Sequence, residues 1–315
     1  MDGITVVVIL SITAVLVFIL NVFCVSIIVR NQQLRSKPSS ILTANLLSMH
    51  ILQAVATMPF YALKRLPETN SNFVCSGFRF FYILTFYIAC FCVLLISLDR
   101  FLAFRLKMKY RTTVTSQRVK YVLALVWVYI ITLCCIPFAY RTEKCSYNPP
   151  PHWVVFMLLV NCFLPCLIIV GIYTYIMVCL RRFEKLKNKK TSQSGGMVTI
   201  SKSNKRITRN TMILVATYGI AWLPSIIFYL IQSLFPEVFS DSYYDSTEDQ
   251  YISFFLKYIK FVEGITSPIL YCYLNTFFRK TVMELFCMDT SAIRPEQSEF
   301  QTQAVIVING KASSD

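Results

Sequence analysis

The sequence predicts an all-α membrane protein built around a bundle of seven membrane-spanning helices. Of its 315 residues, 56% are hydrophobic and only 15% are charged, and the mean hydropathy is +0.56. The apolar residues gather in seven segments, and a helix needs about 20 apolar residues to cross a bilayer. The basic residues gather in alternate loops between these segments, which is typical of membrane proteins.

The seven predicted spans follow one another along the chain. They cover 4–30, 39–64, 75–104, 119–140, 153–180, 208–235 and 251–274. The first is longer than the apolar part of a signal peptide, about 7–15 residues, so we expect it to remain as a spanning helix. The next segment, 275–286, is shorter and amphipathic, with Arg279 and Lys280 opposite its apolar face. We expect an eighth helix there, lying on the membrane surface.

The loops predict the orientation of the chain in the plasma membrane. The first, third and fifth loops carry most of the lysine and arginine residues, whereas the sixth, 236–250, is acidic. Basic loops remain in the cytoplasm, so the N-terminus is expected outside and the C-terminus inside. This pattern accounts for the net charge of +15 without a nucleic-acid partner. Membrane lipid is the partner that we expect along the spans.

We expect one domain and a tail. The domain covers residues 1–287, including the surface helix 275–286, and the polar residues 288–315 are expected to form a disordered cytoplasmic tail. Most of the 12 cysteines lie inside apolar segments, where cysteine serves as a small packing residue. Cys287 follows the amphipathic segment and is a candidate for lipidation. The sequence predicts neither a metal site nor a cofactor.

Short motifs stand in a fixed order on the predicted helices. They are Asn21 in the first, "SLDRF" (97–101) at the end of the third, Trp127 in the fourth, Pro165 and Tyr173 in the fifth, "WLP" (222–224) in the sixth, and "SPILY" (267–271) in the seventh, followed by "NTFFRK". Together they resemble the rhodopsin-like (class A) family of G-protein-coupled receptors over about residues 4–287. The resemblance implies a receptor, not an enzyme, that passes an extracellular signal to heterotrimeric G proteins.

The resemblance also implies a disulfide and an activation switch. Cys75 and Cys145 would tie the second outer loop to the third helix. Arg100 would be restrained by Asp99 at rest and would contact the G protein after the sixth helix swings outward. The other switch residues implied are Tyr173, Tyr218, Trp222, Pro224, Pro268 and Tyr271. In some relatives an acid on the sixth helix completes the restraint, but Asn204 stands there, so we expect raised basal signalling.

Four positions depart from the family pattern around its sodium site. They are His50, Ala89, Glu263 and Ser267. His50 replaces the aspartate that helps to bind the ion. A neutral histidine is a poor ligand for a hard cation and a protonated one repels it, so we do not expect ordinary sodium regulation. Three interpretations of His50 remain open: a pair with Glu263, a structural hydrogen bond to a backbone carbonyl or water, and proton sensing.

Family geometry predicts which residues face the ligand cavity. They are Arg79, Tyr82, Ile83, Phe86, Ser225, Tyr229, Ser253, Lys257 and Lys260. Buried cations require charged partners, so one hypothesis is a ligand with a carboxylate or phosphate. The alternative is that these cations reach solvent or pair with the acidic loop 236–250. The stretch before the first span is short, so we expect a small ligand or a short peptide.

The predicted function is therefore that of a signalling receptor, with two alternatives. A receptor-like protein with lost or constitutive signalling is favoured by the departures at His50 and Ser267 and opposed by the intact Arg100, Trp222 and Tyr271. A transporter would need internal repeats or a continuous polar pathway, and the sequence shows neither. We also expect receptor kinases and arrestin as partners, because loop and tail carry hydroxyl residues. These are Ser192, Ser194, Thr199, Ser201, Ser291 and Ser298.

Overall fold

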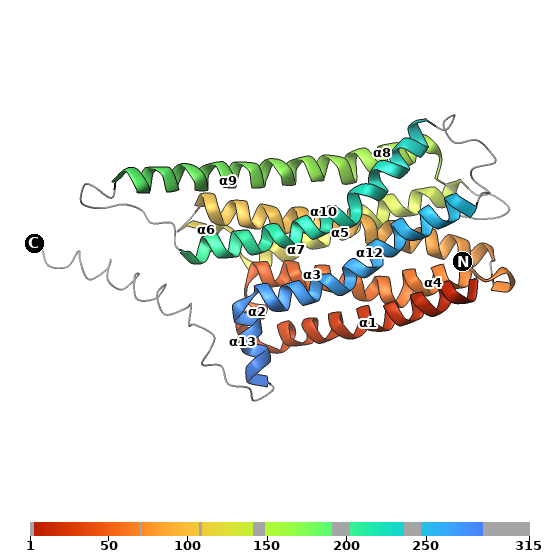
Figure 1. The fold of residues 1–315 in the computed structure, drawn as a ribbon, viewed down its shortest axis with the longest axis horizontal. Helices are drawn as coiled ribbons and strands as arrows, with labels where there is room; N and C mark the ends of the chain where they lie inside the picture. Colours follow the sequence, from red (N-terminus) through yellow and green to blue (C-terminus); the bar gives the residue numbers. More distant parts are fainter. Residues whose placement is uncertain are drawn as a thin grey trace, which may run out of the picture.

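The computed structural model describes residues 3–69, 71–106, 109–140, 149–190, 202–235 and 247–285. Regular secondary structure in these residues is helical throughout, as the sequence predicts. In chain order the elements are α1 (Gly3–Arg30), α2 (Gln32–Arg35), α3 (Pro38–Leu52), η1 (Gln53–Thr57), α4 (Met58–Lys64), η2 (Pro67–Thr69), α5 (Asn72–Leu106), α6 (Tyr110–Thr113), α7 (Ser116–Cys135), η4 (Ile136–Ala139), α8 (Pro151–Leu158), η5 (Leu159–Phe163), α9 (Leu164–Lys190), α10 (Lys202–Leu234), α12 (Thr247–Leu274) and α13 (Thr276–Leu285). The long helices run side by side (Figure 1).

Each of the seven predicted spans corresponds to one helix or to consecutive helical pieces. Six of them are long and apolar enough to cross a membrane. The predicted seventh, α12, is less apolar because Lys257, Lys260 and Glu263 interrupt its sequence. The second span runs through α3, η1 and α4, and the fifth through α8, η5 and α9. The polar tail 288–315 and Cys287 lie outside the described residues, so their predictions remain untested.

Two spans contain a π-helical turn directly before a proline. The turn η1 precedes Pro59, and the turn η5 precedes Pro165. Proline has no N–H to donate, and its ring crowds the carbonyl one turn earlier, so a widened turn accommodates it. Each turn also rotates the residues beyond it relative to a regular helix. The sequence pattern therefore predicts these spans well but not which face each half presents to the bundle.

Helix α5 forms the centre of the bundle. In its most apolar window, 61% of the residues are buried inside the protein, compared with 28% in α1 and 22% in the span formed by α7 and η4. The main hydrophobic cluster contains many α5 residues, among them Ile88. Ile130 of α7 and Trp222 of α10 belong to the same cluster. The residues at the two ends of the bundle are therefore connected by one central helix.

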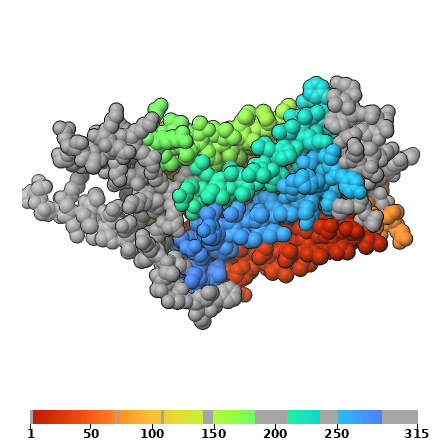
Figure 2. Space-filling model, viewed as in Figure 1, coloured from red at the N-terminus to blue at the C-terminus, as the bar shows by residue number. Residues whose placement is uncertain are grey.

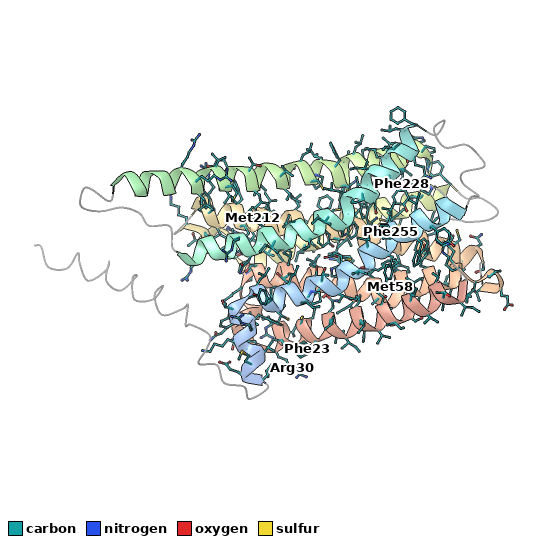
Figure 3. The ribbon with its side chains drawn as sticks, viewed as in Figure 1. Phe23, Arg30, Met58, Met212, Phe228 and Phe255 are labelled. Atoms are coloured by element: carbon teal, nitrogen blue, oxygen red, sulfur yellow. The ribbon has the colours of Figure 1, made fainter. Side chains whose placement is uncertain are left out.

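The outward faces of the helices are apolar. Ile220 of α10 is 73% exposed and Leu125 of α7 is 70% exposed, with many other large apolar side chains. Figure 2 shows α1, α12, α10 and α9 lying across one long face, and Figure 3 shows apolar side chains such as Phe255 along the helices. An apolar surface that surrounds packed helices is the arrangement that a bilayer requires. The structure thus supports a multi-pass membrane protein.

Helix α13 turns away from the end of α12 (Figure 1). The side chain of Asn275 accepts a hydrogen bond from the Phe278 N–H at 3.1 Å and so caps the helix start. Phe278 is completely buried against Tyr271, and the Lys37 ammonium lies 4.0 Å from the centre of the Phe277 ring. These contacts fix α13 to the bundle. Its placement on a membrane surface remains a prediction.

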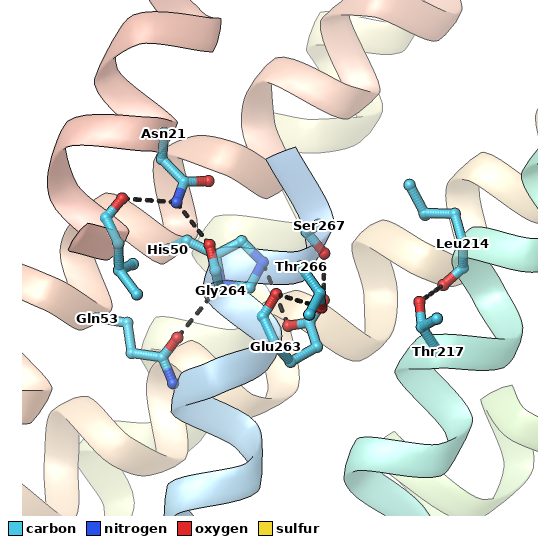
Figure 4. Close-up of polar contacts among 10 residues, drawn as sticks. Asn21, His50, Gln53, Leu214, Thr217, Glu263, Gly264, Thr266 and Ser267 are labelled. Carbon is cyan, nitrogen blue, oxygen red and sulfur yellow. Dashed lines mark hydrogen bonds and ion pairs between the residues drawn. The ribbon is translucent and has the colours of Figure 1, made fainter. Parts of the chain in front are cut away.

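Asn21 joins the first and last spans. Its side-chain nitrogen donates to the carbonyl of Val17 at 2.7 Å and to that of Gly264 on α12 at 2.8 Å (Figure 4). Asn21 is completely buried. The second bond crosses between helices, and in lipid no water is available to replace it. Asn21 is therefore a structural tie between α1 and α12.

We expect Asn21→Ala to lower the free energy of unfolding by about 1–3 kcal/mol, because the Gly264 carbonyl loses a buried donor. The thermal midpoint of the purified protein in detergent should fall by roughly 2–10 °C. Ser11→Ala is the control, since Ser11 is an exposed residue on the same helix. Equal midpoints for the two variants would contradict this role of Asn21.

Candidate functional site

The most unusual feature of the interior is a buried lysine enclosed by aromatic rings. Lys260 of α12 is only 1% exposed. Its ammonium donates a hydrogen bond to the Tyr82 hydroxyl at 2.6 Å. It lies 4.9 Å from the centre of the Tyr82 ring, 4.6 Å from Phe86, 5.1 Å from Trp222 and 5.7 Å from Tyr229. We call these four residues the aromatic cage.

The aromatic cage satisfies Lys260 only in part. An ammonium group has three N–H donors, and one of them is used by Tyr82. The ring faces attract the charge through cation–π interactions, each contributing about 0.5–2 kcal/mol. Among the described residues, no carboxylate lies within ion-pair distance of Lys260. Lys260 therefore lacks an ionised partner among the described residues.

A second lysine, Lys257, lies one turn before Lys260 on α12, nearer the end of the bundle that carries Lys64. Lys257 donates to the carbonyl and the hydroxyl of Ser253. Its ammonium lies 5.6 Å from the centre of the Tyr229 ring, so that ring contacts both lysines. Lys64 is within electrostatic reach of Arg65, Arg79 and Lys257. Positive charge thus extends from this end of the bundle down to the aromatic cage.

The structure brings together only some of the predicted ligand residues. Tyr82, Phe86, Tyr229, Lys257 and Lys260 surround one another as described above. Ser225 and Ile83 are not part of this group. The Ser225 hydroxyl is buried and donates to the Leu256 carbonyl at 3.2 Å, and Ile83 packs near Cys75 and Phe138. Ser225 thus joins α10 to α12, and Ile83 belongs to the packing at the outer end of α5.

The aromatic cage is continuous with a stack of three rings. The ring centres of Phe86 and Trp222 are 4.6 Å apart, and those of Trp222 and Tyr218 are 5.3 Å apart, with interplanar angles of 15° and 7°. The indole N–H of Trp222 and the hydroxyl of Tyr218 are buried without a hydrogen-bond partner among the described residues. Lys260 is therefore in direct contact with the Trp222 ring, one of the predicted switch residues.

His50 and Glu263 meet below this stack. The distance between His50 Nε2 and Glu263 Oε2 is 3.3 Å, and the two residues are 0% and 2% exposed. His50 Nδ1 lies 3.3 Å from Gln53 Oε1. The other oxygen of Glu263 accepts a hydrogen bond from Ser267 (Figure 4). Ala89 is fully buried on α5 and offers no polar atom. Among the described residues, the polar contacts of the His50 ring are therefore with the side chains of Gln53 and Glu263.

The opposite end of α5 carries a compact polar cluster. Arg100 donates to the carboxylate of Asp99, and the Tyr110 hydroxyl donates to the same carboxylate at 2.5 Å. Burial, followed by the neighbouring Asp99, raises the pKa of the Tyr110 phenol. Tyr110 therefore stays protonated and remains a donor at physiological pH. The Asp99 carboxylate restrains Arg100 and is itself held by Tyr110 of α6.

The remaining switch residues are buried in the bundle. Tyr173 of α9 and Tyr271 of α12 have hydroxyl groups without a hydrogen-bond partner among the described residues. Pro224 lies inside α10 and Pro268 inside α12. The structure places Tyr173 and Tyr271 on different helices, so their predicted approach during activation remains a proposal. Cys75 is disulfide-bonded, and its predicted partner Cys145 lies outside the described residues.

Three residues at these sites were not predicted from the sequence. Gln53 contacts His50, Tyr61 packs under the Lys257 ammonium at 5.8 Å, and Tyr110 holds Asp99. Gln53 is the first residue of the π turn η1, and Tyr61 follows that turn. Tyr61 lies beyond the turn, which rotates it relative to a regular helix, and the apolar pattern alone does not indicate this. For Gln53, its spacing of three residues from His50 was an available signal.

The chemistry of these clusters fits binding and switching. The described residues contain no group of three or more His, Cys, Asp or Glu side chains arranged to hold a metal ion. They contain instead a caged cation, a buried acid–base pair and a restrained arginine, each on a different level of the bundle. Groups of this kind change partners when helices shift, without making or breaking covalent bonds.

Known proteins show what the chain is similar to. The model of the seven-transmembrane receptor family (rhodopsin family) matches residues 20–271. "Neuropeptide receptor 22" of Caenorhabditis elegans is 22% identical over 302 residues, which cover 87% of this chain and 67% of the relative. The "Substance-P receptor" of Aquarana catesbeiana is 25% identical, covering 65% and 51%, and the "Allatostatin-A receptor" of Bombyx mori 24%, covering 82% and 73%.

The matched segment spans about half to three quarters of the length of these three relatives. The match to the family model, residues 20–271, begins inside α1 and ends inside α12. It includes the aromatic cage, the His50–Glu263 pair and the Asp99–Arg100 cluster. The chain belongs to the rhodopsin family of seven-transmembrane receptors.

Proposed function

We propose that this receptor binds a short peptide carrying an anionic group, next to Lys257 and Lys260, and activates heterotrimeric G proteins. The relatives named above are, by their names, receptors for neuropeptides, substance P and allatostatin A. The proposed place is the plasma membrane, with the N-terminus outside and the basic loops inside. The proposed partners on the cytoplasmic side are the G protein, receptor kinases and arrestin.

The observation that carries the proposal is that the buried Lys260 ammonium has one hydrogen bond, to Tyr82, and no ionised partner among the described residues. A buried cation without an ionised partner is unfavourable, and an anionic ligand group would supply the missing interactions. Lys257 and Lys260 both contact the Tyr229 ring, so an anion between them would displace that ring and bridge the two ammonium groups. The positive charges of Lys64, Arg65 and Arg79 would attract an acidic peptide towards this place.

Contact with Lys260 offers a route from ligand to cytoplasm. Lys260 lies over the Trp222 ring, and Trp222 stacks on Tyr218 of the same helix, α10. A ligand that draws Lys260 away from Trp222 favours a state in which the α10 ring stack repacks. Such a ligand shifts an existing equilibrium towards the state that frees Arg100.

A screen tests the proposed function as a whole. Cells expressing the receptor with a promiscuous G protein would be exposed to a library of short peptides, with calcium release as the readout. We expect the active peptides to share a carboxylate or another anionic group. Activation by neutral, non-peptide compounds alone would contradict the proposal.

For an active peptide, we expect Lys260→Gln to lower potency by roughly 10- to 150-fold, because a charge-assisted hydrogen bond contributes about 1.5–3 kcal/mol. Replacing the acidic group of the peptide by an amide should cause a similar loss in the wild type and little further loss in Lys260→Gln. Lys280→Gln is the control, since that lysine is exposed on α13. Additive losses from the two changes would show that Lys260 does not bind the anionic group.

The Asp99 cluster makes a separate prediction about basal activity. Asp99→Asn removes the carboxylate that restrains Arg100, and Tyr110→Phe removes the donor that holds the carboxylate. We expect basal G-protein activation above that of mock-transfected cells in the wild type and a further rise of about 2- to 5-fold in Asp99→Asn. Tyr110→Phe should show a smaller rise.

The control for that experiment is Tyr121→Phe, because Tyr121 is an exposed tyrosine on α7. Surface expression of each variant would be measured in parallel, so that activity is compared per receptor. Basal activity equal to that of mock-transfected cells in all variants would contradict the weak restraint of Arg100.

A further inference from the structure

The ring of His50 is enclosed by oxygen atoms on both sides. Nε2 lies 3.3 Å from Glu263 Oε2, and Nδ1 lies 3.3 Å from Gln53 Oε1. A carboxylate and an amide carbonyl are both acceptors, so a ring with hydrogen on both nitrogens directs a donor toward each of them. That ring carries a positive charge, and the Glu263 carboxylate carries the compensating negative charge. The pair as a whole is then neutral.

Burial makes this neutral arrangement strongly favoured over either charged one. Removal of the shared proton would leave an isolated carboxylate inside the bundle, and a second proton would leave an isolated imidazolium. If the proton moves from His50 to Glu263, the pair still holds one proton and no net charge. The pair therefore keeps a proton at the point where α3 meets α12.

The surrounding groups are linked to the same pair. Ser267 donates to the second oxygen of Glu263, and the Tyr218 ring centre lies 6.5 Å from that of His50. Tyr218 is also within electrostatic reach of Cys90 and Cys92 on α5. Lys260, one turn from Glu263 on α12, uses Tyr82 as its hydrogen-bond partner. Among these neighbours, Glu263 alone contacts the His50 ring with an acidic group.

A sodium ion does not fit these residues. Hard cations require several oxygen ligands, and a positive imidazole repels them. Ala89 supplies no oxygen, and Glu263 is already engaged by Ser267 and His50. The ring also fills the available space, because a methyl group added to Gly264 would lie 3.3 Å from His50 Nδ1 and 3.1 Å from Val17. The sodium site that the family resemblance implies is therefore disrupted here.

We propose that the His50–Glu263 pair, which shares one proton and fills the place of a sodium ion, holds α3 to α12 whatever the sodium concentration. The proton stays in the pair and the ring is part of the chain, so the bond between the helices does not depend on the sodium concentration. This inference concerns the interior of the bundle and is independent of the ligand proposed above. Its test therefore needs no ligand.

The experiment measures the thermal midpoint of the purified full-length receptor in detergent, in about 150 mM sodium chloride and in choline chloride of equal ionic strength. We expect equal midpoints for the wild type. His50→Asp places two carboxylates together beside Ser267 and Gln53, which creates an oxygen-rich site of negative charge. That variant should gain a sodium-specific rise of about 3 °C or more, and His50→Asn should not.

A sodium-specific rise in the wild type would overturn the proposal. So would a folded His50→Asp variant whose midpoint is the same in both salts, since His50 would then not be the group that excludes the ion. Glu263→Gln gives a second test if His50→Asp does not fold. It should lower the midpoint by several degrees in both salts, compared with Glu284→Gln, whose residue is exposed on α13. Equal midpoints for these two variants would show that His50 has no ionic partner in Glu263.

Discussion

The interior of this receptor depends on how the bundle accommodates charged side chains on one helix, α12. Lys260 and Glu263 are three residues apart and almost completely buried. A charge in a bundle surrounded by lipid is unfavourable unless it is paired or hydrogen-bonded. Although the two residues are close in sequence, they take different partners: Lys260 binds Tyr82 and the aromatic cage, and Glu263 binds His50 and Ser267.

These partners connect α12 to several helices. Asn21 links it to α1, His50 to α3, Tyr82 to α5, and the Trp222 ring under Lys260 to α10. A shift of α12 therefore changes all of these contacts together. The Lys260 ammonium in the aromatic cage has an incomplete set of hydrogen-bond partners, which suits a binding site. The His50–Glu263 pair is neutral and enclosed, which suits a permanent contact between two helices. The two charges on α12 thus serve opposite purposes in our account.

Much of the fold follows from the sequence. Apolar length alone gives six of the spans, because the bilayer requires apolar helices of about 20 residues, whereas α12 is interrupted by charged residues. The structure moves their boundaries by a few residues, as with α5, which begins at Asn72 and ends at Leu106. The π turns η1 and η5 were not predicted, since hydropathy does not report how a helix accommodates Pro59 or Pro165. They change which residues beyond the turn face inward, and for that reason Tyr61 was missed.

The site residues were predictable to a different degree. Motif order placed Arg100, Trp222 and Lys260 on the right helices, but their contacts depend on side-chain packing across the bundle. Tyr110 begins the short helix α6 between two spans, and the sequence there gives no sign that it reaches Asp99. The separation of Lys260 from Glu263 likewise required the structure, because both lie on the same helix at a spacing that permits a direct contact.

The most direct test of this account is an experimental structure of the receptor with a bound peptide agonist. We predict that an anionic group of the peptide lies about 3 Å from the Lys260 ammonium, with Tyr229 displaced from between Lys257 and Lys260. His50 and Glu263 should remain in contact in the same structure. An agonist that leaves Lys260 enclosed by the four rings of the aromatic cage, with its acidic group elsewhere, would contradict the account.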